Sequence, residues 1–234
     1  MDRTKTQQLG HGAAALTGKA LEGVFAATGR IRPTRKPLHP RGRLHSATIE
    51  GVGLRDGIGV PWVDDPGTST GVVRVSRAIG IPTALPDIYG LSLRVPLVDG
   101  EHADLLFATT GLGRLTRFVL FPAQHPGQRA YSTLLPYRSP AGAVVLAAVP
   151  VGADGLVFDL ACARVGGAWE SFARMTLTET SSGDSPSFDP VLNQLPGLGY
   201  YDWAAAMREG AYRAARRSRS SDAAAGRRDE GNHD

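Results

Sequence analysis

The stretch that decides the fold is residues 71–111, which read GVVRVSRAIGIPTALPDIYGLSLRVPLVDGEHADLLFATTG. It holds three runs rich in β-branched and other apolar residues. A Pro-Asp-Ile-Tyr-Gly turn at 86–90 separates the first two runs, and an acidic Asp-Gly-Glu turn at 99–101 separates the second from the third. Consecutive strand-like runs joined by short turns predict an antiparallel sheet.

The same pattern continues on both sides of this stretch. Strand-like runs separated by Gly, Pro and Asp turns occur at 44–49, 71–77, 90–97, 103–108, 117–121, 143–149, 156–164 and 171–178. Regularly spaced short strands of this kind predict an antiparallel sheet or a closed barrel. Short helices are expected at both ends of the chain, so the fold class is α+β.

Three segments are expected along the chain. Residues 1–29 carry a helical apolar face and are predicted to form one or two short helices. Residues 30–217 are predicted to form one barrel domain that ends in a helix over 202–217, with Asp202 as its N-cap. Residues 218–234 are polar and rich in arginine, and are predicted to be a disordered tail.

The composition is that of an ordinary globular protein, with 42% hydrophobic and 21% charged residues. Of the 26 basic residues only three are lysines, and six of the arginines lie beyond position 212, so the net charge of +4 reflects a solvated tail. No nucleic-acid-binding module is recognisable. The longest apolar run, residues 141–151, is too short to span a bilayer, and the N-terminus lacks a signal-peptide core. We therefore expect a cytoplasmic protein with neither a nucleic-acid nor a membrane partner.

Three groups of residues could carry chemistry. His39 follows a proline-rich basic segment in KPLHPRG, and Arg74 and Ser76 lie in the strand-like VRVS. Arg208 and Tyr212 are four residues apart in the predicted terminal helix, so they share one helix face. The other histidines, apart from His45, lie in turns or termini.

These groups, taken in this order along the chain, resemble the haem-dependent catalases, and in particular small single-domain catalase-related proteins. The resemblance covers roughly residues 30–215 and includes the lead-in Leu195-Pro196-Gly197-Leu198. It implies a catalase-like antiparallel β-barrel and haem as cofactor. The substrate implied is hydrogen peroxide or an organic hydroperoxide, a small molecule.

The resemblance also implies a role for each residue. His39 would be the distal histidine that moves a proton between the peroxide oxygens, with Ser76 hydrogen-bonded to it. Tyr212 would bind the iron as a phenolate, which a neighbouring Arg208 favours. Arg74 would contact a haem propionate, and Arg219 occupies the place of a further arginine of the helix.

One position departs from the catalase pattern. Catalases carry an asparagine near the end of the third strand, where it positions peroxide, and this chain has Thr109 in the corresponding stretch LFATT. Thr109 could donate a hydrogen bond there. The turn of the family also differs, because it reads Asp87-Ile88-Tyr89-Gly90 in this chain.

Several alternatives stay open at the level of sequence. Arg74 could form a cross-strand ion pair with Asp104 or Glu101, and His45 would compete for the distal role if the strand register differed by one. The barrel could be a haem-free ligand-binding or structural module. A hydrolase such as a phosphodiesterase is a third option, and a homo-oligomer is compatible with all of them. Cys162 stands alone in an apolar run and is expected to be a core residue.

Overall fold

The computed structural model describes residues 42–78, 82, 84–97, 100–179 and 186–206. All of them belong to the larger of two compact units, Pro37–Asp234. The predicted helices of residues 1–29, the predicted tail, His39, Arg208, Tyr212 and Arg219 lie outside the described residues. Residues 202–206 are helical, and the Ala205 amide donates to the Tyr201 carbonyl at 2.9 Å, so Tyr201 occupies the N-cap position predicted for Asp202.

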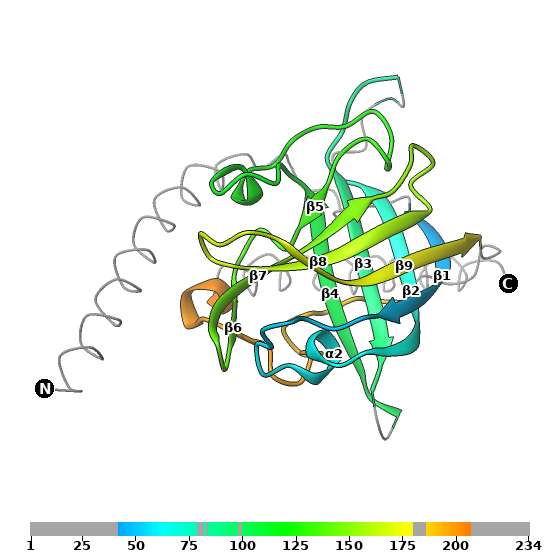
Figure 1. The fold of residues 1–234 in the computed structure, drawn as a ribbon. Coiled ribbons are helices and arrows are strands. Elements are labelled where there is room, and N and C mark those ends of the chain that lie inside the picture. The colour runs from blue at the N-terminus through cyan, green and yellow to red at the C-terminus, as the bar shows by residue number, and fades with distance from the viewer. Residues whose placement is uncertain (1–41, 79–81, 83, 98–99, 180–185, 207–234) are drawn as a thin grey trace, which may run out of the picture. The chain divides into compact units, whose positions relative to one another are not determined.

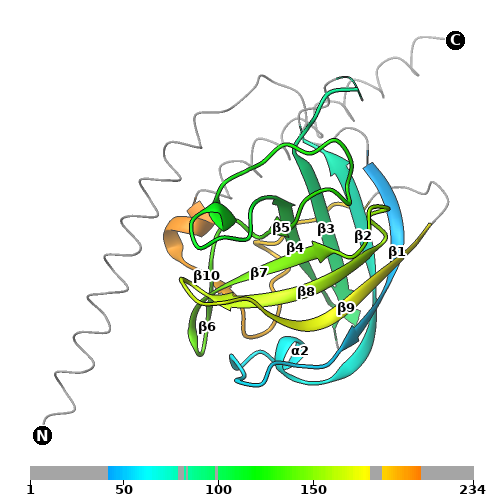
Figure 2. The same cartoon turned by 45° about the horizontal axis from the view of Figure 1, so that its top comes forward.

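Eight antiparallel strands form a closed barrel (Figures 1 and 2). In ring order they are β1 (Gly42–Gly51), β2 (Gly67–Arg77), β3 (Tyr89–Pro96), β4 (His102–Thr109), β5 (Tyr131–Ser132), β7 (Gly142–Pro150), β8 (Val157–Arg164) and β9 (Glu170–Glu179). The ring closes because β9 pairs with β1 along seven residues. Two short strands extend the sheet beside β7, namely β6 (Tyr137–Ser139) and then β10 (Gly199–Tyr200).

Seven of the eight strands expected from sequence are confirmed, and one expectation is wrong. Residues 117–121 do not form a strand, because Thr116–Phe118 is a single 3-10 turn, η2. The turn is fixed locally: the amide of Gly113 donates to the Thr116 hydroxyl at 2.9 Å, and the amide of Arg117 donates to the Gly113 carbonyl at 3.0 Å. One further short helix, α2 (Pro61–Asp64), begins with proline at its first position.

The interior of the barrel is filled with apolar side chains. Along β2, β3 and β4 every second residue faces inward, so Val73 lies beside Leu93 and Leu105 in one row across the sheet. All three are at most 1% exposed. Across the barrel, the Tyr131 and Phe158 rings meet edge to face at 5.9 Å. An eight-stranded barrel is just wide enough for its own side chains to fill it, as they do here.

The outer wall is covered in part by irregular segments that polar groups hold in place. Asp104 lies on the outer face of β4 and is 1% exposed. Its carboxylate accepts from Nε and Nη2 of Arg94 at 2.7 and 2.8 Å. It also accepts from the Asp189 amide and from Nδ2 of Asn193, both at 2.8 Å. One buried carboxylate therefore ties residues 187–193 to the barrel.

A buried arginine holds a second irregular segment against β5. Arg117 is 2% exposed, and its Nη2 and Nε donate to the carbonyls of Gly167 and Gly113 at 3.0 and 3.2 Å. Its guanidinium lies 4.4 Å from the Trp169 ring centroid, a cation–π contact. The Ser132 hydroxyl donates to the Arg117 carbonyl at 2.5 Å. Arg117 thus joins the turn at 113–118 to β5 and to the β8–β9 turn.

We predict that Asp104→Asn destabilises the fold by about 2 kcal/mol, because it leaves the half-buried Arg94 without its counter-charge. Burial alone raises the pKa of Asp104, but the hydrogen bonds from Arg94, Asn193 and Asp189 outweigh it and hold this pKa below its ordinary value. The carboxylate's contribution is therefore complete above the unfolded-state pKa of about 3.9 and is lost as the pH falls through the lower folded pKa.

Urea denaturation between pH 7 and pH 3 measures both effects. The variant should show the loss at pH 7 and a shallower acid-side decline than the wild type. Asp159→Asn is the control, because Asp159 also pairs with an arginine across two strands, Arg174 at 2.9 Å, but on an exposed surface, so its loss should change stability little. Equal losses in the two variants would contradict the role given to Asp104.

Candidate functional site

Arg74 and Ser76 project from the same face of β2, the outer wall of the barrel. Their neighbours Val73 and Val75 alternate with them and share the inward face with Leu93 and Leu91. Side chains two apart along a strand point the same way, so Arg74 and Ser76 are neighbours on one surface. Ser76 is 3% exposed and Arg74 is half-buried.

Ser76 stands in a row of small residues that crosses four strands. The register pairs Gly42 of β1 with Ser76, Ser76 with Gly90 of β3, and Gly90 with Ala108 of β4. We call Gly42, Ser76, Gly90 and Ala108 the small-residue row. No side chain in it is larger than serine, and its central residues Ser76 and Gly90 are buried. Such a row lets a covering segment pack closely, and it equally suits a planar ligand.

The Arg74 side chain lies at the β1 end of the small-residue row. A Cβ on Gly42 would stand 2.6 Å from Nε and 2.9 Å from Cζ of Arg74. Only glycine at position 42 leaves the guanidinium where it is. The sequence analysis did not single out Gly42, Gly90 or Ala108, because their alignment depends on a strand register that the sequence does not show.

The sequence left open a cross-strand ion pair between Arg74 and Asp104. In the structure, the arginine that pairs with Asp104 is Arg94. Asp104 is paired across the β3–β4 ladder with Arg94, and both of its oxygens accept from Arg94. Arg74 stands opposite Ser92, two residues from Arg94 along β3. The Asp104 carboxylate thus helps to hold residues 187–193 against the barrel.

Thr109 lies on the other face of the sheet from Ser76. Ala108 is the residue in register with Gly90 and Ser76, and Thr109 pairs with Tyr131, whose ring lies inside the barrel. The Thr109 hydroxyl is fully buried and accepts from the amide of Tyr89 at 3.1 Å. The structure therefore brings Arg74 and Ser76 together and places Thr109 apart from them.

His45 also points away from the face of Arg74 and Ser76. It pairs with Val73, is 7% exposed, and so stands with the inward-facing residues. Cys162 is 3% exposed, and burial raises its pKa to about 12, which leaves no thiolate at neutral pH. Within the described ranges, no group of three or more His, Cys, Asp or Glu could hold a metal ion. Nor does any described helix have the length and hydropathy to cross a membrane.

The closed eight-stranded antiparallel barrel is a catalase-like fold, as the sequence predicted. Solved structures that match include those of a fungal catalase (TM-score 0.54, 10% identity), a bacterial catalase (0.55, 11%) and catalase A from Saccharomyces cerevisiae (0.55, 8%). The matches cover 78%, 83% and 81% of this chain and 58%, 59% and 61% of those catalases. The chain thus spans about three fifths of their length. No family model matches the sequence, and no curated protein matches it significantly.

The geometry predicts a structural role for the Thr109 hydroxyl that a simple pair of variants can test. Thr109→Val keeps the volume but leaves the buried Tyr89 amide without its acceptor, which should cost about 1–3 kcal/mol. Thr109→Ser keeps the hydroxyl and should lose much less. Thermal and urea unfolding of both variants provide the measurement. Wild-type stability in Thr109→Val would mean that the hydroxyl is available for a ligand instead.

Proposed function

We propose that this protein is a small cytoplasmic haem protein of catalase-like fold that reacts with hydrogen peroxide or an organic hydroperoxide. The observation that carries the proposal is the placement of Arg74 and Ser76 side by side on the outer wall, over the small-residue row. The sequence order of His39, Arg74, Ser76, Arg208 and Tyr212 supports it independently. The catalase-like fold agrees with it.

The small-residue row supports the choice of a planar ligand. No large side chain projects from it across four strands, which would allow close stacking. Arg74 stands at its edge, where a guanidinium can meet a carboxylate in a bidentate pair. The glycine at position 42 keeps that guanidinium in place. Arg74 would bind a propionate, and Tyr212, assisted by Arg208, would bind the iron.

When bound, haem would supply the redox-active iron at which a peroxide O–O bond is broken. The chain's own residues would do the rest. His39 would accept a proton from one peroxide oxygen and donate it to the other, which suits a group whose pKa is near neutral. Ser76 would orient the His39 ring by a hydrogen bond. The buried position of Ser76 would shield that bond from water.

One observation favours a second candidate, a catalase-fold protein without haem. The Thr109 hydroxyl stands where catalases place their peroxide-positioning asparagine in sequence, yet it is bound to the Tyr89 amide on the inward face. A barrel that no longer positions peroxide could serve as a ligand-binding or structural module. The haem experiment separates the two candidates.

We predict that the full chain, expressed with haem supplementation, carries stoichiometric haem with a Soret band. Tyr212→Phe should abolish or strongly shift this band, because the phenolate oxygen is removed. Tyr201→Phe is the matched control: it removes a phenol from the same terminal region and should leave the spectrum unchanged. Absorbance and pyridine-haemochrome titration provide the readout. Haem-free protein, or a spectrum indifferent to Tyr212, would select the haem-free candidate.

We further predict that Ser76→Ala reduces the rate of peroxide consumption by about tenfold, because it removes one hydrogen bond that orients His39. Its haem content and Soret position should stay those of the wild type. Ser171→Ala, which removes an exposed hydroxyl of β9, should consume peroxide at the wild-type rate. An oxygen electrode follows the reaction. Unaltered turnover in Ser76→Ala would remove Ser76 from the site.

A further inference from the structure

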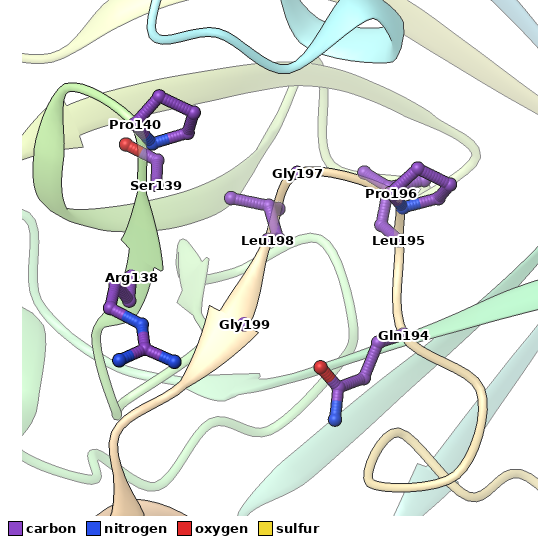
Figure 3. A pocket seen from close by; sticks show the side chains of 9 residues that line it. All are labelled: Arg138, Ser139, Pro140, Gln194, Leu195, Pro196, Gly197, Leu198 and Gly199. Carbon is purple, nitrogen blue, oxygen red and sulfur yellow. The ribbon is translucent and has the colours of Figure 1, made fainter.

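A separate pocket lies between β6 and the segment that leads into β10 (Figure 3). Its volume is about 510 Å³, within the range of small-molecule sites. One wall consists of Arg138, Ser139 and Pro140, and the other of residues 194–199. None of these residues belongs to the small-residue row.

Both walls of the pocket lie against residues 58–59, so the shape of the pocket is largely preformed. Pro196 and Gly197 form a tight turn that the Leu198 amide closes onto the Leu195 carbonyl at 2.9 Å. Gly197 has a φ of 87°, and a Cβ on it would stand 2.9 Å from the Gly59 carbonyl oxygen. The other wall is anchored by the Ala141 amide, which donates to the Ile58 carbonyl at 3.2 Å. A preformed pocket loses less entropy when it binds.

The polar and apolar groups of the pocket are segregated. Figure 3 shows the Arg138 guanidinium and the Gln194 amide toward one end, with the Pro140 and Pro196 rings toward the other. The Gln194 amide nitrogen donates to the Val191 carbonyl at 2.9 Å, which fixes the side chain and leaves its second N–H. The lining therefore offers a cationic, hydrogen-bonding end and an apolar end.

Arg138 is available for a ligand. Among the residues that the structure describes, no carboxylate lies within ion-pair distance of its guanidinium. Gly199 faces it, and a Cβ there would lie 3.9 Å from Nη2, so no side chain of β10 covers the charge. Burial raises the pKa of the nearby Tyr201 phenol, and the charge of Arg138 offsets part of that rise. The phenol is neutral at physiological pH and does not compete for the cation.

We propose that this pocket binds a small organic acid, with its carboxylate on Arg138 and its apolar body against Pro140 and Pro196. A carboxylate matches the planar fork of a guanidinium in a bidentate pair. Inorganic phosphate shares the anionic oxygens but has no body to fill about 510 Å³. The proposal is independent of haem binding, because it involves none of the residues assigned to that site.

Isothermal titration of the full-length protein with benzoate, benzyl alcohol and inorganic phosphate tests the proposal. For a ligand of this size we expect a dissociation constant of about 1 mM for benzoate. Benzyl alcohol, which lacks the charge, and phosphate, which lacks the body, should each bind at least about tenfold more weakly. Phosphate binding as tight as benzoate would replace the organic acid with an inorganic anion.

Three variants locate the site. Arg138→Gln should weaken benzoate binding by about tenfold. Gly199→Val keeps the charge and fills the space beside it, so it should also weaken binding. Arg55→Gln removes an equal charge from a side chain that is 94% exposed and should leave the affinity unchanged. The proposal fails if benzoate does not saturate the wild type, or if Arg55→Gln and Arg138→Gln lose affinity equally.

Discussion

The pairing of β9 with β1 is the constraint on which the rest of the structure depends. It joins His45–Gly51 to residues 173–179, which are more than 120 positions away in the chain. A sheet closed in this way has no free edge over the length of that ladder. Closure also fixes the register of the whole ring. Once β1 is held on both sides, β2, β3 and β4 follow as successive hairpin neighbours, and each residue's face is decided.

Because side chains alternate between the two faces of a strand, the register decides which polar residues lie on the outer wall and which lie inside the barrel. Arg74 and Ser76 fall on the outer wall, while His45 and Thr109 fall on the inward face with the apolar core. The inward polar groups serve the core, as the Thr109 hydroxyl does for the Tyr89 amide. The outer wall is therefore the surface of β1–β4 on which a ligand can be recognised without opening the barrel.

Periodicity in the sequence predicts the long strands well and the short ones poorly. The strands β1–β4 and β7–β9 each hold at least eight residues, enough for alternation and turn residues to be visible in the sequence. The short strands β5, β6 and β10 have two or three residues each, and they exist only because β7 or β6 offers them an edge. The segment 117–121 is apolar enough to suggest a strand, but the Gly113–Thr116–Arg117 hydrogen bonds turn it back on itself.

The candidate sites likewise divide into a part that the sequence predicts and a part that it does not. Two residues of one strand, Arg74 and Ser76, could be placed together from a period of two. The face of Thr109 could not, because it depends on which residue of β4 aligns with Gly90. The pocket at Arg138 was beyond prediction, since its walls are more than fifty residues apart in sequence and meet through a β6–β10 ladder of two pairs.

Two buried polar residues explain how irregular segments cover part of a regular barrel. Asp104 and Arg117 hold irregular segments against the outer wall through hydrogen bonds to backbone groups and amides. Apolar packing inside the barrel does not depend on those segments. Their sequences can therefore change as long as the few atoms that meet these two residues keep their places. The three solved catalases share this fold at 8–11% identity, so the barrel itself tolerates extensive change of sequence.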